Sequence, residues 1–427
     1  MNKSTLLLMG LMATIAFTGC NKKNGLEGQL VGATDRPKWD ATLMPYGMVY
    51  IPSGTFHTGS SDQDIVYSMQ APTKQISISG FFMDETEITN NEYRQFVEWV
   101  RDSIAHKLIG GDHLTDAGED GGSQHINWDM PIDWSEDGED AQYVNQLFYT
   151  EENRIHGRRE LDPTKLVYEY QWVNWKDMAY DKAKTKPRSA YIEKKSTEVW
   201  PDEGVWIRDF TYSYNEPMTR SYFTHPAYDE YPVVGVTWNQ ANAFSYWRTA
   251  LWGNYKLEKG EAFPEEFRLP FEHEWEYAAR GGRMLSPYPW GGPYIRNTKG
   301  CLLANFKPGR GNYPEDGGMY TVPAKSYWPN DYGLYNMAGN VSEWTLSAYA
   351  ENSYAFMHDM NPDIRYDAKD SDPSTLKRKV IRGGSWKDIA YFLQTSTRDW
   401  EYQDTAKSYI GFRDVMPFLG RSINDFK

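Results

Sequence analysis

Two residues of this 427-residue chain, Cys20 and Cys301, could act as thiol nucleophiles or redox groups. Thiol chemistry needs an accessible cysteine with a lowered pKa, often with a second cysteine beside it. With two cysteines in all, the chain has no disulfide framework. Cys301 is best interpreted as a small buried apolar residue, because that is the usual role of an isolated cysteine.

Other catalytic patterns are also weak. The eight histidines include no close pair with metal-ligand spacing, so zinc and iron sites are poorly supported. There is no Gly-x-Ser-x-Gly elbow and no phosphate-binding glycine loop. Glu272, Glu274 and Glu276 surround His273, but on a helix they point to different faces, and solvated or capping roles explain them better.

A hard cation has a better candidate site. Residues 336–343 (NMAGNVSE) form a glycine-containing turn that ends in the carboxylate of Glu343. Calcium takes about six to eight oxygen ligands, many of them backbone carbonyls, and such a turn can present them. The alternative is an internally hydrogen-bonded loop in which Glu343 caps backbone amides.

The charge balance excludes one class of partner. The chain has 45 basic and 59 acidic residues and a net charge of −14, so a phosphate backbone would repel it and nucleic acid is not an expected partner. Aromatic residues make up 15%, and they suit both loop-rich cores and interaction surfaces. Residues 112–140 hold ten carboxylates without a lysine or arginine, which is most simply a solvated loop.

Two strands and a helix are predicted in the first part of the chain. Residues 48–56 alternate apolar and small residues around a turn, and 76–82 is a second strand candidate. Thr89 and Glu92 have the spacing of a capping box, so a helix is predicted over 90–101.

Two more helices precede a region without periodicity. Thr237 and Gln240 form a second capping box, and four residues of the helix after it should face inward: Ala241, Phe244, Trp247 and Leu251. Glu272–Arg280 is a third helix, ended by two glycines. The amino-acid sequence after residue 282 indicates short strands and long ordered loops.

A signal peptide is predicted at residues 1–19. Lys3 precedes an apolar run at 6–17, which is too short to span a bilayer as a helix but suits a signal-peptide core. Small residues directly before Cys20 resemble a lipoprotein box, in which this cysteine is lipidated and becomes the first residue. The alternative is an ordinary secretion signal in which Cys20 is incidental.

Residues 20–44 are polar and are predicted to form a tether, followed by a domain over 45–427. Three acyl chains on Cys20 exceed what stable anchoring requires. Residues 21–23 lack the acidic cluster that resembles a surface-export signal in Bacteroidota lipoproteins, so we expect a periplasmic protein anchored to the outer membrane. No later run is long enough to be a transmembrane helix.

Several blocks together resemble the formylglycine-generating-enzyme (sulfatase-modifying factor) family. They are Met48–Phe56, Asp84–Tyr93, Pro232–Trp238, Arg268–Gly282, Tyr332–Trp344, Arg382–Trp386 and Gly411–Arg413. The resemblance covers roughly 45–104 and 226–417. It implies one irregular α+β domain of the formylglycine-generating-enzyme (C-type-lectin-like) fold, with few helices, interrupted by an acidic and aromatic insertion at about 107–230.

The chain departs from the enzymes of this family. Their oxidase uses two cysteines shortly after the Gly-Gly-Ser block, whereas residues 386–398 (WKDIAYFLQTSTR) contain none. We therefore expect a pseudoenzyme without copper, since a fold does not carry its function with it. The resemblance also implies two structural calcium sites. One matches Asn336, Gly339, Val341 and Glu343, and the other matches Asn305, Phe306, Asp316 and Gly318.

A closer resemblance extends into the insertion. Residues 206–218 and 225–235 are similar to the GldK/PorK family of gliding-motility and type IX secretion lipoproteins of Bacteroidota. This implies a structural ring component that self-associates and binds a GldN/PorN-type periplasmic ring protein and other secretion-system components. The alternatives are a GldJ-like motility lipoprotein and a lectin-like ligand-binding module. The insertion could carry protein contacts or fold back on its own domain.

Overall fold

The computed structural model describes most of the chain from residue 44 onward. The described ranges are 44–60, 71–115, 125–182, 184–209, 216–261, 263–309, 312–315 and 318–419. The predicted signal peptide and Cys20 lie outside them, as does the predicted tether up to residue 43. Within these ranges no helix combines the length and the apolar composition that crossing a bilayer requires.

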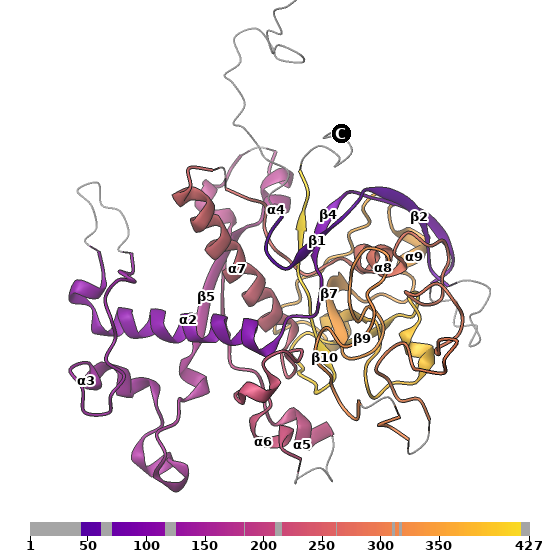
Figure 1. The fold of residues 1–427 in the computed structure, drawn as a ribbon. Coiled ribbons are helices and arrows are strands. Elements are labelled where there is room, and N and C mark those ends of the chain that lie inside the picture. The colour runs from indigo at the N-terminus through magenta and orange to yellow at the C-terminus, as the bar shows by residue number, and fades with distance from the viewer. Residues whose placement is uncertain are drawn as a thin grey trace, which may run out of the picture. The chain divides into compact units, whose positions relative to one another are not determined.

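The described strands are short and form two small sheets and two strand pairs (Figure 1). The first sheet is antiparallel, in the order β1 (Met48–Ile51), β4 (Phe81–Asp84) and β11 (Val415–Pro417). The second has the order β10 (Ile410–Gly411), β7 (Ser342–Ala348), β8 (Arg378–Arg382) and β9 (Asp399–Tyr402), with β10 parallel to β7. The antiparallel pairs are β2 (Gly54–Thr58) with β3 (Lys74–Ile78), and β5 (Val167–Val173) with β6 (Ile192–Glu198).

Three described helices exceed two turns: α2 (Asn90–Ile109), α7 (Trp238–Glu258) and α8 (Glu272–Arg280). The short ones are α3 (Ala141–Val144), α4 (Trp175–Tyr180), α5 (Val205–Asp209), α6 (Met218–Ser221) and α9 (Ser353–Phe356). Few helices, short strands and long loops are what the family resemblance implied, and the expected fold class is confirmed.

The predicted helix starts are confirmed, and the helix ends are less accurate. Both capping boxes are formed, and Gly281 ends α8 in the left-handed conformation with φ of 58°. The helix predicted over 90–101 continues to Ile109, because Ala105 packs against the insertion. Leu251 was expected to face inward, but it is half exposed. The strand predicted over 76–82 is divided between β3, which ends at Ile78, and β4, which begins at Phe81 and belongs to another sheet.

Two buried clusters hold the domain together. In the larger one, α2 and α7 pack against the second sheet, and Tyr93 stacks on Phe244 with ring centroids 5.7 Å apart. In the other, Trp275 of α8 packs with Met83 of the first sheet. Burial of these apolar surfaces is the main stabilising contribution to the domain.

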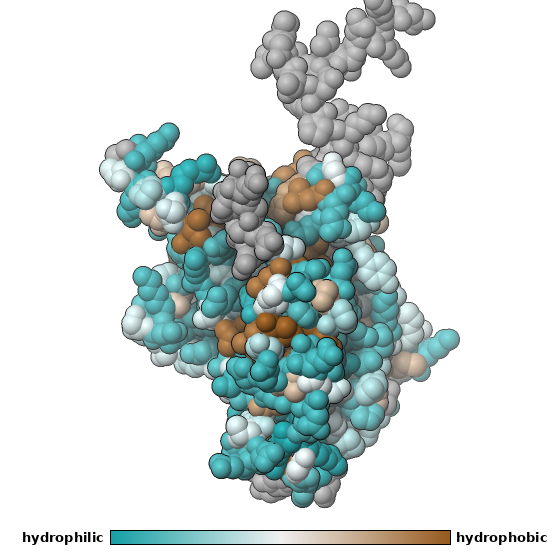
Figure 2. Space-filling model, turned by 90° about the vertical axis from the view of Figure 1, so that its left-hand side faces the viewer, coloured by the Kyte–Doolittle hydropathy of each residue, from teal (hydrophilic) through white to brown (hydrophobic). Residues whose placement is uncertain are grey.

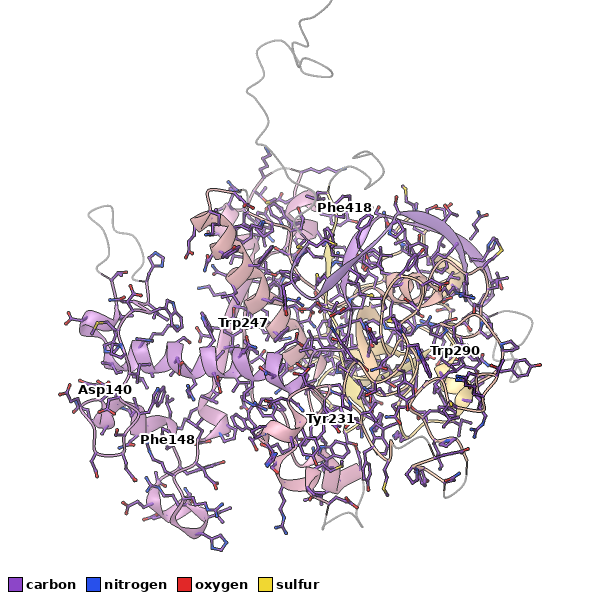
Figure 3. The ribbon with its side chains drawn as sticks, viewed as in Figure 1. Asp140, Phe148, Tyr231, Trp247, Trp290 and Phe418 are labelled. Atoms are coloured by element: carbon purple, nitrogen blue, oxygen red, sulfur yellow. The ribbon has the colours of Figure 1, made fainter. Side chains whose placement is uncertain are left out.

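The insertion adds two packed parts. One surrounds the C-terminal half of α2, where Arg101 lies 4.6 Å from the ring of Trp134. Figure 3 shows Asp140 and Phe148 at this end, far from Trp290. The stretch 112–140 is therefore more than a solvated loop, because its described part includes packed apolar side chains as well as exposed carboxylates.

The other packed part is the β5–β6 pair, which lies on α7. Tyr170 stacks on Tyr246 with centroids 4.7 Å apart, and Trp172 lies 5.8 Å from the same ring. This part of the insertion folds back on its own domain, which is one of the two alternatives left open by the sequence.

Candidate functional site

The turn before β7 has a strained backbone that packs against Asn305. Asn336, Gly339 and Asn340 have φ values of 51°, 81° and 61°. A Cβ atom at Gly339 would lie 2.3 Å from the carbonyl oxygen of Asn305, so this position requires glycine. The Asn340 N–H donates to the same oxygen at 2.8 Å. The structure thus places Gly339 and Asn305, one from each predicted set of calcium ligands, side by side.

A buried carboxylate that the sequence did not single out lies beneath this turn. The side-chain amides of Asn336 and Asn340 donate to the two oxygens of Glu87 at 3.1 and 3.0 Å. Burial raises the pKa of Glu87 to about 8; Arg413 opposes this shift and Glu343 adds to it. The only sequence signal was its place in the Asp84–Tyr93 block of the family resemblance.

Glu343 is held by side chains. Arg413 donates from Nε and Nη2 to its two oxygens, each at 2.7 Å, and Trp275 donates from Nε1 at 2.7 Å. All three side chains are fully buried. The negative charge is therefore already compensated, and the predicted capping of backbone amides is replaced by this ion pair.

Asn305 fits a cation better. Its Nδ2 donates to the carbonyl of Tyr320 at 2.7 Å and to Asn340 Oδ1 at 3.3 Å. Its Oδ1 atom is buried and accepts no hydrogen bond from the described residues. Buried polar atoms are normally satisfied, so this oxygen has the character of a cation ligand.

The other predicted ligands contribute differently. Gly318 lies against Asn305, because a Cβ atom there would approach its Oδ1 to 2.9 Å. Phe306 and Val341 are buried in two apolar clusters, and Asp316 lies outside the described residues. The part of the chain that the structure describes contains no group of three His, Cys, Asp or Glu side chains that could hold a metal ion.

The segment at 386–398, where the family resemblance led us to look for the oxidase cysteines, is held by other contacts. Ser385 donates from its hydroxyl and its N–H to Asp388 Oδ2, at 2.5 and 3.0 Å. Leu393 is fully buried. Cys301 is exposed, so the expectation of a small buried residue is wrong.

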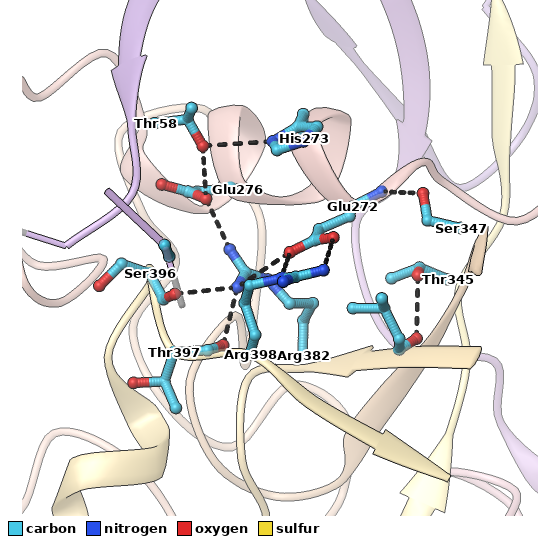
Figure 4. Close-up of polar contacts among 12 residues, drawn as sticks. Thr58, Glu272, His273, Glu276, Thr345, Ser347, Arg382, Ser396, Thr397 and Arg398 are labelled. Carbon is cyan, nitrogen blue, oxygen red and sulfur yellow. Dashed lines mark hydrogen bonds and ion pairs between the residues drawn. The ribbon is translucent and has the colours of Figure 1, made fainter. Parts of the chain in front are cut away.

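The carboxylates of α8 form a buried ionic network (Figure 4). Arg280 and Arg382 donate to Glu276, each at 2.7 Å, and Arg398 donates to Glu272 at 2.5 and 3.0 Å. Although burial opposes ionisation, the two arginines lower the pKa of Glu276 to about 2. These groups link α8 to β8 and to the segment at 386–398.

The roles expected for the α8 carboxylates need correction. Glu272 and Glu276 were expected to be solvated or to cap, yet both are buried and paired. Only Glu274 caps the helix, accepting from the Phe271 N–H at 2.9 Å. Burial lowers the pKa of His273, which contacts Thr58 Oγ1 at 3.2 Å. The network is thus suited to stabilisation and not to proton transfer.

The insertion's tryptophans differ in availability for contacts. Trp206 is only 2% exposed, and its ring stacks on Trp386 with centroids 5.9 Å apart. Trp172 and Trp200 are half-buried against the larger cluster. Trp175 is 60% exposed. Of these four tryptophans, Trp175 in α4 is therefore the most available for protein contacts.

Comparisons with known proteins give a consistent result. The family model "Sulfatase-modifying factor enzyme 1-like domain" matches residues 34–417. The formylglycine-generating enzyme of Mus musculus is 26% identical over 393 residues, covering 91% of this chain and 78% of the relative. The inactive C-alpha-formylglycine-generating enzyme 2 of Bos taurus is 25% identical over 380 residues, covering 86% of each. The formylglycine-generating enzyme of Streptomyces coelicolor is 34% identical over 189 residues, covering 43% and 52%.

Proposed function

Because this chain belongs to the sulfatase-modifying factor family, we propose that it is a member that retains the fold without the oxidase activity. The observation that supports this proposal is the absence of cysteine from residues 386–398. The position of Asp388 supports it further, since its carboxylate is engaged by Ser385. The family includes both active and inactive relatives by name, so the proposal of an inactive member is supported by the sequence of this segment and not by family membership.

A direct assay tests this proposal. The purified chain is incubated with a peptide that carries the sulfatase motif, with and without copper, and the product is followed by mass spectrometry. We expect no formylglycine above the blank. Turnover that disappears in Cys301→Ala would show that the exposed thiol acts as a catalyst and would overturn the proposal.

The role that we propose instead is structural. The protein would be anchored by Cys20 to the outer membrane and would form a periplasmic ring of the type IX secretion and gliding machinery with a GldN/PorN-type partner. The support is the resemblance of residues 206–218 and 225–235, together with an insertion that extends away from the core along α2 (Figure 3). Rings need two different contact faces on each subunit, and an extension of this kind can supply one.

Mild extraction from the native membrane tests the assembly. We expect a megadalton complex that contains one further protein in a fixed ratio. Recovery of a monomer under conditions that keep the membrane machinery intact would contradict the ring. A complex of the same size that lacks the GldN/PorN-type partner would favour the GldJ-like alternative.

Structural calcium at Asn305 forms part of the proposal. The support is the buried Oδ1 atom, which accepts no hydrogen bond from the described residues, with Gly318 and the turn at 336–341 packed around Asn305. A cation there would join the two loops and stabilise the fold, because it binds the folded chain alone.

A lectin-like role has one supporting observation. A cavity of about 150 Å³ lies between β5, β6 and α7, lined by Tyr170, Trp172, Tyr246, Lys195 and Asp367 among others. Aromatic rings beside polar groups suit a sugar ring. Calorimetric titration with periplasmic oligosaccharides tests this: binding that is lost in Tyr246→Ala but retained in Trp328→Ala would favour the lectin-like alternative.

A further inference from the structure

We propose that the turn between β5 and β6 docks on an anionic lipid surface. We name this segment the basic tip. It carries six exposed cations: Lys176, Lys182, Lys184, Lys186, Arg188 and Lys194. Residues 174–195 contain seven basic and three acidic residues, a net charge of 7 − 3 = +4. The remainder of the chain has 38 basic and 56 acidic residues, a net charge of −18.

The acidic residues of the tip shape its backbone and do not neutralise its lysines. Asp181 accepts hydrogen bonds from the N–H groups of Thr185 and Lys186 at 3.1 and 3.3 Å and from the Tyr191 hydroxyl at 2.5 Å. Glu193 accepts from Asn174 Nδ2 at 2.6 Å. None of the six exposed cations forms an ion pair within the described residues. The described residues of the tip are therefore held by hydrogen bonds to its acidic side chains, and its positive charges are available to a partner.

Exposed aromatic residues lie among these cations. Trp175 and Tyr180, at the two ends of α4, are 60% and 73% exposed. Tryptophan and tyrosine beside lysine are typical of segments at a membrane–water interface, where the ring enters the headgroup region and the ammonium group meets phosphate. A solvated turn has no need of large exposed rings.

The tip lies at the end of the domain where the described chain begins. Lys195 contacts Asn239 near the start of α7, whereas Trp172 contacts Tyr246 further along it, so the tip extends toward the C-terminal end of α7. Tyr46 lines a cavity with Leu251 and Trp252 at that same end. Figure 1 shows α4 and the end of α7 together in the upper part of the molecule.

The hydrophobic side chains of this region support the same orientation. Tyr46 is 94% exposed, and Tyr255, Leu257 and Phe263 are about half exposed. In Figure 2 hydrophilic groups dominate the face shown, and the hydrophobic groups lie in its upper and middle parts. An anionic membrane would attract the basic tip and repel the rest of the chain, which selects one orientation.

A lipid surface is the favoured partner of the basic tip because the chain between the proposed anchor and the domain is short enough to limit their separation. Met44 is 24 residues from Cys20, and such a segment spans at most about 80 Å. The inference therefore rests on the proposed anchoring, which would keep the tip near a bilayer. A second copy of this chain, with its acidic stretch at 112–140, is the competing partner.

Vesicle flotation tests the inference on the mature chain, residues 20–427, carrying Cys20→Ser, so that neither an acyl group nor the apolar run at 6–17 contributes. We expect it to float with phosphatidylethanolamine–phosphatidylglycerol vesicles at low salt and not with phosphatidylcholine vesicles. The triple variant Lys182→Glu, Lys184→Glu, Lys186→Glu should reduce partitioning at least about tenfold. The control variant Lys107→Glu, Lys299→Glu, Lys369→Glu changes three other exposed lysines and the net charge by the same amount, and should still float.

Two results would overturn the inference. The first is equal flotation of the tip variant and its control. The second is a change of oligomer size in the tip variant without vesicles, while flotation stays unchanged, because the tip would then bind protein. An unchanged melting temperature shows that both variants fold. The assay contains neither partner nor anchor, so failure of the ring proposal leaves its outcome unaffected.

Discussion

Glu343 and Arg413 form a doubly hydrogen-bonded ion pair in which neither side chain is exposed. Both contacts are 2.7 Å long, and Trp275 adds a third donor to the carboxylate. Arg413 also donates to the carbonyls of Asp84 and Tyr335, at 3.0 and 2.9 Å. The pair therefore joins the end of the turn at 336–343 to the first sheet. The carboxylate of Glu343 thus has a structural role that does not depend on a cation.

Glu343→Gln should destabilise the protein strongly. The substitution removes the charge of the carboxylate that is doubly hydrogen-bonded to Arg413, and breaking a buried pair from one side costs about 3–5 kcal/mol. Denaturant unfolding at neutral pH measures the change. Glu351→Gln removes a carboxylate that is largely exposed and lies 3.8 Å from Arg378, so it should change stability little. Equal effects of the two substitutions would show that the pair has no special role.

Stability should fall as the pH rises toward neutrality, partly because of Asp414. Burial raises the pKa of this carboxyl to about 7, and Arg248 opposes the shift. Ser245 donates to Oδ1 at 2.7 Å, and buried Oδ2 accepts no hydrogen bond from the described residues. The folded chain therefore retains a proton that the unfolded chain releases near pH 4, so stability declines between about pH 4 and 7.

Asp414→Asn tests this pH dependence, because it keeps the shape and removes the titration. Unfolding free energies measured at pH 5 and 7.5 should differ less in the variant than in the parent, by about 1–2 kcal/mol. Glu87 contributes a decline of the same sign up to about pH 8, so a residual slope is expected. An identical slope in both proteins would rule out Asp414 as a contributor.

Removal of calcium should lower the melting temperature, and Asn305 should determine the effect. Binding to the folded state alone stabilises it by mass action. We expect a chelator to lower the melting temperature of the parent and to leave that of Asn305→Ala unchanged, with recovery of the parent after calcium is restored. Asn352→Ala, at the start of α9, is a control that should retain the response. A parent melt that is insensitive to the chelator would contradict calcium at this site.

Substitution of Trp206 should lower stability, whereas substitution of Trp175 should not. Trp206→Ala removes a buried ring from between Trp386 and Tyr222 and should cost about 3–5 kcal/mol. Trp175→Ala removes an exposed ring and should leave the denaturation midpoint within experimental error. Circular dichroism melts of both variants measure the difference. A stable Trp206→Ala protein would mean that the insertion packs loosely on the domain.

Much of the fold could be predicted from local signals. Capping boxes at Thr89 and Thr237 depend on side chains within one helical turn, and Gly281 ends α8 through its own backbone freedom. The end of α2 could not be placed in this way, because its last turns are held by Val144 and Leu147, some forty residues later in the chain. The exposure of Leu251 likewise depends on tertiary packing.

The sequence predicted several residues of the candidate site but not the contacts that join them. Sequence motifs located the turn at 336–343, but the partners of Glu343 and Glu87 come from segments that are distant in the chain. Glu272 and Glu276 were misjudged because carboxylates in a sequence look solvated unless their arginines can be placed. The burial of the arginines that pair with these two carboxylates can be seen only in the three-dimensional structure.

The stacking of Trp206 on Trp386 has a consequence for any attempt to introduce oxidase activity into this protein. The insertion contributes one indole and the segment at 386–398 contributes the other, so each shields the other from water. Installing two cysteines in residues 386–398 would place thiols in a segment that Trp206 still covers. An engineered oxidase on this scaffold would require the insertion to be remodelled as well as the thiols to be restored.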